Sequence, residues 1–265
     1  IGKGSFSMVY LGFDINNNKY AIKCIEIEKL NDKQIERINL EMKISMRLEH
    51  PNIVKCYDNF RTHKHWYLVS EYCDGGILQN INTMLKKKNN SQREYLTKIY
   101  MTQLKDALQY LRSNNIIHRD LKPQNILFLK KCNDPNVKSK INISDDNCEY
   151  ILKLADFGFA RYYNYETETN NGYDNMLNTI CGTPLYMAPE IAINEKYNIK
   201  ADLWSFGVIL YEMVYCKNPY NCPKTKNELI KLMKEQKINY SGEYSKECNS
   251  LLKKLLEIDP VNRIT

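Results

Sequence analysis

Hydrophobic and polar residues alternate in short runs over the first part of the chain, a pattern typical of β-strands. The predicted strands cover residues 7–14, 19–27, 53–60 and 66–73. The first two are joined by Asn16-Asn17-Asn18, a turn sequence that predicts a hairpin. Between the strand pairs, apolar residues recur among charges at helical spacing, namely Ile35, Ile38, Met42, Ile44 and Met46. Residues 33–48 therefore predict an amphipathic helix that ends before Pro51.

The pattern becomes helical after Asp74-Gly75-Gly76, a turn signal that we interpret as a hinge. One helix is predicted from apolar side chains at helical spacing, which are Tyr95, Ile99, Leu104, Leu108 and Leu111. Residues 201–215 are almost continuously apolar, as expected of a helix buried in a core. Two further helices are predicted at residues 226–234 and 246–258.

These elements predict an α+β fold with two lobes. The small β-rich lobe, with its one helix, covers about residues 1–73, and the hinge and larger helical lobe cover about residues 71–265. Two polar stretches, residues 130–149 and 162–178, fit neither period and are expected to be loops. The chain does not begin with Met and it stops in mid-pattern at Thr265, so we expect it to be part of a longer protein.

Composition narrows the class of protein. The chain has 265 residues, of which 43% are apolar and 26% are charged, values ordinary for a globular protein. No run approaches the roughly 20 apolar residues of a membrane span, so no transmembrane segment is predicted. The net charge of +7 accompanies many Lys, Asn, Ile and Tyr residues. Genome composition explains that bias, and we expect no specific nucleic-acid partner.

The nine cysteines are scattered singly, without a C-x-x-C pair or a zinc-like His cluster. Free thiols are typical of a reducing compartment, which favours the cytoplasm.

The glycine-containing start of the chain, Gly2-Lys3-Gly4-Ser5-Phe6-Ser7, leaves three readings open. It fits a phosphate-binding loop with Ser7 in place of a third glycine, a degenerate loop, or an ordinary turn. Three later motifs decide between them: residues 117–125 (IHRDLKPQN), residues 155–158 (ADFG) and residues 187–190 (MAPE). Together and in this order they resemble the signature set of serine/threonine protein kinase catalytic domains.

The resemblance covers essentially the whole chain and implies ATP and Mg²⁺ as cofactors and protein substrates. Asp120 resembles the aspartate that accepts the proton of the substrate hydroxyl. Lys122 resembles the lysine that steadies the transferred phosphate, and it argues against a tyrosine kinase. Asn125 and Asp156 would supply oxygen ligands to Mg²⁺.

In the small lobe, the resemblance assigns Lys23 of Ala21-Ile22-Lys23 to the α- and β-phosphates of ATP. Its partner on the following helix would be Glu41, with Glu36 as the rival. In the large lobe, Asp202 would hold the catalytic loop, and Glu190 would pair with Arg263.

The remaining expected ATP contacts come from the glycine loop and the hinge. Adenine would bond the backbone carbonyl of Glu71 and the backbone N–H of Cys73, with Ser70 at the gatekeeper position. Side chains expected to sandwich the ring are Ile1, Val9, Ala21 and Leu127, and the loop glycines are Gly2 and Gly4.

Residues 179–184 (TICGTP) resemble an activation segment. Thr179 would be the phosphorylated residue, with Arg119 as a cationic partner for its phosphate. Thr183 would instead contact Asp120 and Lys122. Phe159, which follows Asp-Phe-Gly, indicates a preference for Ser over Thr in the substrate.

The subfamily resembled most is the autophagy-initiating (ULK) kinase group, on the sequence around the hinge, residues 71–76 (EYCDGG), and residues 155–161 (ADFGFAR). Two departures are Ser45 and Cys56, where the family often carries bulkier apolar residues. We expect a monomeric catalytic domain that responds to an activating kinase or a regulatory subunit. A pseudokinase scaffold without catalysis is the alternative function, and a small-molecule kinase is a third.

Overall fold

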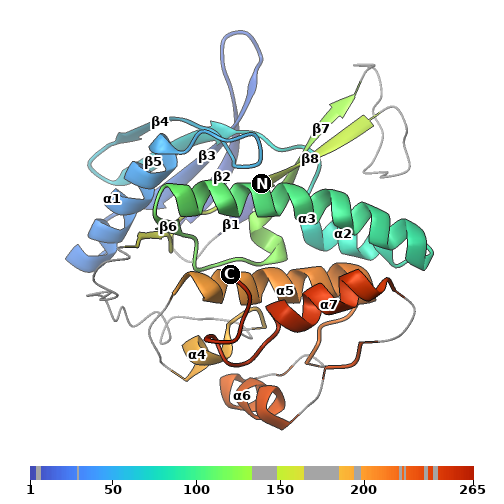
Figure 1. Cartoon of the computed structure of the whole chain (residues 1–265). Coiled ribbons are helices and arrows are strands. Elements are labelled where there is room, and N and C mark those ends of the chain that lie inside the picture. Colours follow the sequence, from blue (N-terminus) through green and yellow to red (C-terminus); the bar gives the residue numbers. More distant parts are fainter. Residues whose placement is uncertain are drawn as a thin grey trace. The chain divides into compact units, whose positions relative to one another are not determined.

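The computed structural model describes residues 1–3, 7–28, 30–132, 148–163, 185–193, 198–220, 223, 225–235, 238–240 and 244–265 (Figure 1). These residues form two compact units. The first unit contains residues 1–78, 103–110 and 124–161, and the second contains residues 79–102, 111–123 and 162–265. This division differs from the expected boundary near residue 73, because a later pair of strands packs with the N-terminal residues.

The first unit is built on a five-stranded antiparallel sheet of order β1-β2-β3-β5-β4. Its strands are β1 (Gly2–Lys3), β2 (Ser7–Phe13), β3 (Lys19–Glu26), β4 (Cys56–Arg61) and β5 (His65–Glu71). The predicted hairpin between β2 and β3 is confirmed, and the Asp14 carboxylate accepts the backbone N–H groups of Asn16 and Asn18 at 2.8 and 2.9 Å. β4 begins later than predicted, because Ile53 forms an isolated bridge with Leu154 instead of pairing with β5.

The helix α1 (Asp32–Arg47) confirms the predicted amphipathic helix. It begins at a capping box in which the Asn31 side chain accepts from the Gln34 backbone and the Gln34 side chain accepts from Asn31. Met42 lies in an apolar cluster with Trp66 and Leu68 of the sheet. In Figure 1, α1 lies beside β4 and β5. Met46, which the pattern grouped with the apolar face, is 41% exposed.

Two further strands complete the first unit, β7 (Ile126–Cys132) and β8 (Cys148–Leu154), which pair antiparallel. Residues after β5 run close against β7. The Gly75 N–H donates to the Phe128 carbonyl at 2.7 Å, and Phe128 N–H donates to Gly76 at 2.9 Å. A Cβ on Gly75 would lie 2.6 Å from the Phe128 carbonyl oxygen, so the close approach requires glycine. The predicted hinge is therefore bonded to β7.

Helices dominate the second unit, where α5 (Ile199–Tyr215) confirms the predicted buried helix. Its N-cap is Asn198, whose side chain accepts from the Lys200 backbone, and twelve of its residues are buried. The other helices among the described residues are α2 (Leu78–Leu85), α3 (Asn90–Ser113), α4 (Pro189–Ala192), α6 (Lys226–Glu235) and α7 (Lys246–Leu255). The short elements are β6 (Ile116–Ile117), the 3₁₀ turn η1 (Pro123–Asn125) and β9 (Arg161–Tyr162).

The helix predicted from Tyr95, Ile99, Leu104, Leu108 and Leu111 is confirmed as α3. Of these side chains, Leu104 and Leu111 are buried, whereas Tyr95 is 66% exposed. The buried face of α3 also includes Tyr100, Met101 and Ala107. α7 ends at Leu255, and the Leu256 N–H caps it on the Leu252 carbonyl, so Ile258 lies beyond the helix.

Candidate active site

Lys23 of β3 is the centre of an ion-pair cluster in the first unit. Its Nζ lies 2.6 Å from Oε1 of Glu41 on α1 and 3.1 Å from Oδ1 of Asp156, which follows β8. The side chain of Glu41 is 6% exposed, whereas that of Asp156 is 43% exposed. The partner of Lys23 is thus Glu41 and not Glu36. One ammonium group is shared between a buried carboxylate and a carboxylate open to solvent.

The cluster keeps Lys23 charged. Burial alone would disfavour the ammonium, but the attraction of Glu41 and then of Asp156 holds the Lys23 pKa above its ordinary value. For Glu41, burial raises the pKa, Lys23 opposes this, and the negative charge of Asp156 raises the pKa further. The two carboxylates therefore compete for one cation, and a second positive charge beside Asp156 would relieve their repulsion.

The backbone around Asp156 is shaped for this contact. Asp156 has a φ of 62°, a left-handed conformation that is costly for a residue with a Cβ. Gly158 follows, and a Cβ there would lie 3.3 Å from both Asp156 Oδ1 and Glu41 Oε2. Glycine at this position lets the chain pass close to both carboxylates. Phe157, which lies between Asp156 and Gly158 in sequence, is buried.

Asn125 brings a second oxygen-bearing side chain to the same unit. It ends η1, is 7% exposed, and accepts the Ala155 N–H on its backbone carbonyl at 2.9 Å. That bond holds Asn125 next to the residue preceding Asp156. Among the described residues no group of three or more His, Cys, Asp or Glu side chains is arranged to hold a metal ion. Asn125 and Asp156 offer only amide and carboxylate oxygens, which suit a hard cation.

The side chains expected around adenine lie along neighbouring strands of the first unit. Ala21 pairs in register with Ser70 and Leu11, and the Ser70 hydroxyl donates to the Ala21 carbonyl at 3.3 Å. Leu127 of β7 forms a bridge with Ile77, just past the hinge. At the start of the chain, Gly2 pairs with Val9 in the β1–β2 ladder, and the N-terminal amino group of Ile1 donates to the Val9 carbonyl at 2.8 Å.

The hinge residue Glu71 is fixed from two sides. Its backbone N–H donates to the Lys55 carbonyl at 2.9 Å, and its Oε1 accepts the Lys55 N–H at 2.7 Å. The same Oε1 lies 2.8 Å from Nζ of Lys153. Two residues further on, burial raises the pKa of the Cys73 thiol to about 12, so this side chain is neutral at physiological pH.

The catalytic-loop candidates lie in the second unit. Lys122 Nζ lies 2.7 Å from Oδ2 of Asp120, and both side chains are partly exposed. The Asp120 N–H donates to Nδ1 of His118 at 3.3 Å, and His118 is fully buried. The carboxylate that would act as the base is therefore positioned by a buried ring behind it and a cation beside it.

Asp202 near the start of α5 holds this loop. Its Oδ2 accepts the His118 N–H at 2.8 Å and its Oδ1 accepts the Arg119 N–H at 3.0 Å. Asp202 is 6% exposed, and Arg119 has a φ of 70°. A buried carboxylate thus stabilises two adjacent N–H groups at a point where the backbone adopts a costly conformation.

Glu190 and Arg263 form the expected pair. Arg263 Nη1 donates to Glu190 Oε1 at 2.7 Å, and Nη2 donates to Oε2 at 2.9 Å. Arg263 also donates to three backbone carbonyls, those of Glu257, Lys200 and Ile258. All five guanidinium N–H donors are therefore used. Its guanidinium lies 5.0 Å from the ring centroid of Trp204.

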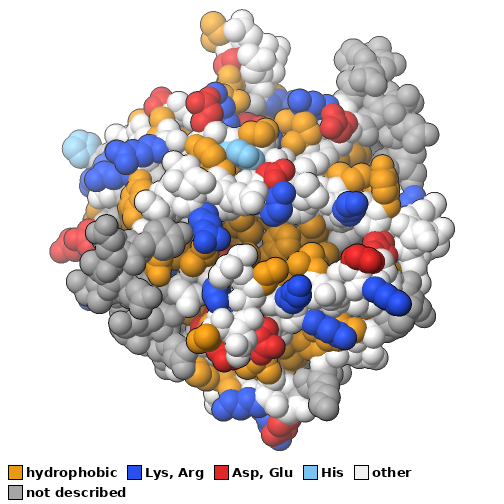
Figure 2. Space-filling model, in the orientation of Figure 1, with side chains coloured by type: hydrophobic (Ala, Val, Ile, Leu, Met, Phe, Trp, Pro, Cys, Tyr) orange, Lys and Arg blue, Asp and Glu red, His pale blue; other side chains and the backbone are white. Residues whose placement is uncertain are grey.

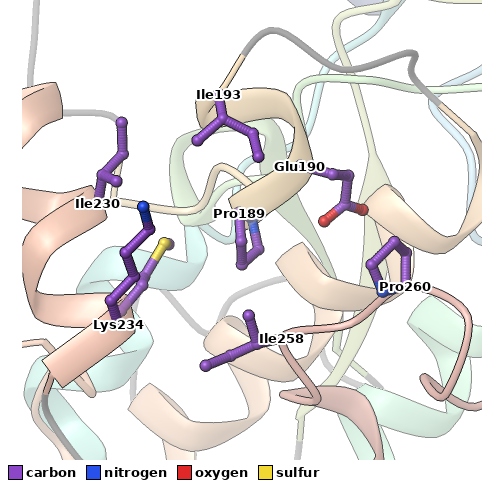
Figure 3. A pocket seen from close by; sticks show the side chains of 8 residues that line it. Pro189, Glu190, Ile193, Ile230, Lys234, Ile258 and Pro260 are labelled. Carbon is purple, nitrogen blue, oxygen red and sulfur yellow. The ribbon is translucent and has the colours of Figure 1, made fainter.

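A hollow of about 140 Å³ borders Glu190, with Pro189 also on its wall (Figure 3). Ile193, Ile230 and Ile258 line it, with Lys234 beside Ile230. None of these residues is an expected ATP, metal or catalytic residue.

Ser45 and Cys56, the two departures from the family pattern, are small and lie in the first unit. Ser45 is 7% exposed. The Cys56 Sγ lies 3.3 Å from the sulfur of Met46, and Cys56 pairs in register with Ser70 on β5. Burial raises the pKa of the Cys56 thiol to about 11, so it behaves as a small neutral side chain.

Three of the expected functional residues, Gly4, Thr179 and Thr183, lie outside the described residues. On the face drawn in Figure 2, Lys and Arg side chains are interspersed with acidic and apolar ones. Of the helices described, none combines the length and the apolar character needed to span a bilayer.

Comparison with known proteins agrees with this geometry. The family model described as "Protein kinase domain" matches residues 1–265. A protein of Acanthamoeba polyphaga mimivirus, named for serine/threonine-protein kinase activity, is 40% identical over 272 residues, which cover 100% of this chain and 59% of that protein. The serine/threonine-protein kinase atg1 of Dictyostelium discoideum is 38% identical over 100% of this chain and 36% of its own length.

The serine/threonine-protein kinase ATG1 of Kluyveromyces lactis is 37% identical over 100% of this chain and 34% of its own length. The chain thus spans between about a third and three fifths of the length of these relatives. The resemblance to autophagy-initiating kinases is confirmed, because several of the matched relatives are ATG1 kinases. With a family match along its entire length and relatives of this similarity, the chain belongs to the protein kinase domain family.

Proposed function

We propose that this chain is an active serine/threonine protein kinase domain that transfers the γ-phosphoryl group of ATP to protein hydroxyls. The observation that carries the proposal is the Lys23 cluster, in which one ammonium contacts Glu41 at 2.6 Å and Asp156 at 3.1 Å. Phosphoryl transfer requires a cation at the phosphates and an anionic metal ligand nearby. This arrangement favours catalysis over the alternative of a scaffold without catalysis.

The nucleotide would bind to residues of the first unit. Lys23 would hold the α- and β-phosphates, the Glu71 carbonyl would accept from the adenine amino group, and the Cys73 N–H would donate to the ring. Side chains proposed to contact the ring are Ile1, Val9, Ala21, Ser70 and Leu127, and Gly2 and Gly4 would lie over the phosphates. The argument for this assignment is that strand register joins Ala21 to Ser70 and that Leu127 bridges to Ile77.

Asn125 and Asp156 fit Mg²⁺ as proposed ligands. They supply two oxygen-bearing side chains and no soft ligand, and Mg²⁺ commonly takes one or two protein oxygens together with nucleotide phosphates. When bound, the ion would neutralise phosphate charge and orient the transferred group. The competition of Glu41 and Asp156 for Lys23 supports this fit, since a divalent cation would reduce the repulsion between the carboxylates.

In the proposed transfer step, Asp120 accepts the proton of the Ser or Thr hydroxyl as its oxygen forms a bond to the γ-phosphorus. The bond from that phosphorus to the β–γ bridging oxygen breaks, and ADP leaves. Lys122, 2.7 Å from Asp120 Oδ2, would contact the transferred phosphoryl group. Serine is the proposed preferred acceptor because of Phe159.

Regulation is proposed to act through Thr179, whose phosphate would pair with Arg119, while Thr183 would position the substrate next to Asp120. We also propose that the protein is located in a reducing compartment and that the catalytic domain is monomeric. The thiols of Cys24, Cys56, Cys73, Cys216 and Cys248 are free, which supports the first of these.

The test is transfer of labelled phosphate from ATP with Mg²⁺ to a degenerate peptide library. We expect the wild-type domain to label Ser-containing peptides, and Asp120→Asn and Lys23→Met to lower the rate by about 10²-fold or more. Thr179→Ala should lower activity and leave the thermal unfolding midpoint unchanged. A wild-type domain phosphorylated on Thr179 that transfers no phosphate would refute the proposal and favour the scaffold.

A further inference from the structure

Lys153 of β8 has no role in the site described so far, yet it is the only lysine in a run of mostly apolar residues, Tyr150-Ile151-Leu152-Lys153-Leu154. Its Nζ lies 2.8 Å from Glu71 Oε1, and the two side chains are 10% and 12% exposed. Surface ion pairs of flexible side chains are rarely this well shielded from solvent. The pair joins β8, whose chain continues directly to Asp156, to the last residue of β5.

The Glu71 carboxylate is a junction of three segments. It accepts from Lys153 on β8 and from the N–H of Lys55, in the segment before β4, at 2.7 Å. The same segment is bonded to β8, because Val54 N–H donates to the Leu154 carbonyl at 2.9 Å and Leu154 N–H donates to Asn52 at 2.8 Å. The Glu71 side chain therefore cannot turn without moving a bond to β8 or to Lys55.

This junction is adjacent to the backbone that would read the purine. Adenine presents an amino donor to the Glu71 carbonyl and a ring acceptor to the Cys73 N–H. Guanine reverses both groups, because it carries an oxygen acceptor and a ring N–H donor at those positions. With guanine, two acceptors would face each other at the Glu71 carbonyl and two donors at the Cys73 N–H. These contacts are costly only if the backbone cannot shift, so discrimination between the two bases depends on how firmly the two backbone groups are held.

We propose that Lys153 is a positioning residue for purine selection, which acts by anchoring Glu71 and thereby the hinge backbone. The inference rests on the proposed function of the hinge as the adenine site. A purely structural purpose is a weak explanation, because replacing a buried ion pair by apolar residues is commonly neutral or stabilising. The hydrogen-bonded ion pair between Lys153 and Glu71 instead fixes the distance and the orientation between the two side chains, which apolar contacts do not.

The experiment measures the affinity of the full chain for ADP and for GDP with Mg²⁺, by calorimetric titration. Nucleotide binding is measured without catalysis, so an inactive protein still reports on the hinge. For the wild type we expect a strong preference for ADP. Lys153→Met should lower the ratio of ADP to GDP affinity by about tenfold, the equivalent of roughly one hydrogen bond. Lys153→Arg, which keeps the charge and can bond the carboxylate, should retain most of the ratio.

Two further variants separate positioning from folding. Lys153→Met leaves a buried carboxylate uncompensated and can unfold the chain, so Lys153→Met with Glu71→Gln removes both charges while keeping the packing. This double variant should remain folded and still show the reduced ratio. Lys131→Met, at an exposed lysine of the neighbouring strand β7, is the matched control and should keep the wild-type ratio.

The outcomes are distinguishable. If ADP binds but no variant changes the ADP to GDP ratio, while Lys153→Met lowers the unfolding midpoint, Lys153 is a structural residue and the inference is wrong. If the wild type binds ADP with the expected preference but transfers no phosphate, the proposed function fails and the inference is still tested by the ratios. If the wild type binds neither nucleotide, the hinge is not a purine site and both are refuted.

Discussion

Replacing Asp202 by asparagine removes one of the two carboxylate oxygens that hold the catalytic loop. Asp202 accepts the N–H groups of His118 and Arg119 at 2.8 and 3.0 Å. The asparagine amide keeps one oxygen and directs an NH₂ group at the other N–H donor. Losing one hydrogen bond to a buried charged group costs about 1.5–3 kcal/mol.

Loss of that hydrogen bond favours a rearrangement of the catalytic loop. Arg119 has a φ of 70°, and a left-handed conformation in a residue with a Cβ costs about 1–3 kcal/mol. The carboxylate of Asp202 offsets this cost in the wild type, and the variant retains only part of that stabilisation. We therefore expect the share of molecules with Asp120 in its working position to fall, and the turnover number to fall about 10- to 100-fold.

The assay measures turnover at saturating ATP and peptide, together with ADP affinity. ADP affinity should stay within about twofold, because the N–H groups of His118 and Arg119 that Asp202 accepts belong to a loop of the second unit. Asp106→Asn is the matched control, since Asp106 makes a solvent-exposed pair with Lys105 and should leave turnover unchanged. Turnover of Asp202→Asn within threefold of wild type would refute the reasoning, as would a parallel loss of ADP affinity.

Three further predictions concern stability and ligand binding. Arg263→Lys should lower the unfolding midpoint by about 6–12 °C, because a lysine has three donors for the five acceptors now bonded, including Glu190. Burial lowers the His50 pKa below 6.5 and its Nδ1 accepts the Asn52 N–H, so stability from this group is complete above pH 6.5 and is lost as the pH falls through the lowered pKa. Denaturant titrations between pH 7 and 5 should show a smaller acid loss for His50→Gln. Ser70→Met should weaken pyrazolopyrimidine inhibitors with bulky C3 groups by about 10- to 100-fold in inhibition assays, because a larger side chain overpacks the site behind adenine.

Each of these has a matched control and a contrary result. Arg112→Lys, at an exposed position near the end of α3, should leave the midpoint unchanged, and an unchanged midpoint in Arg263→Lys would contradict the first prediction. His63→Gln at an exposed site should keep the wild-type pH dependence, and the second prediction is wrong if His50→Gln does so too. The inhibitors should act on Ser113→Met, changed at an exposed site, as strongly as on the wild type. If they inhibit Ser70→Met as strongly as the wild type, that result would count against a pocket behind adenine.

Several parts of the fold could be predicted because they depend on residues close in sequence. The hairpin at Asp14 follows from an asparagine-rich turn, and α1 follows from helical spacing and a cap at Asn31. The motif around Asp120 was recognisable because phosphoryl transfer restricts which residue types can occupy those places. The strand predicted to begin at Ile53 shows the limit, since Ile53 pairs with Leu154, about a hundred residues later, and not with its neighbour in sequence.

The candidate site was predictable in its residue types and in some contacts, such as the pair of Glu190 with Arg263, but not in others. The sequence left Glu36 as a rival to Glu41, and only the packing of α1 against the sheet decides for Glu41, 2.6 Å from Lys23. In the sequence, Lys153 is one charged residue within the mostly apolar residues 150–154. Its partner Glu71 is 82 residues away, and no local pattern connects them.

By itself, the sequence determines the family, the order of the motifs and which side chains can supply a base, a cation and oxygen ligands. The reason is that chemistry and helical or strand periodicity are written into neighbouring residues. Only the tertiary structure decides for Glu41 over Glu36 as the partner of Lys23, and only the tertiary structure brings Lys153 to Glu71. Such pairs depend on distances of a few ångströms between segments far apart in the chain, and strand register and helix packing set those distances.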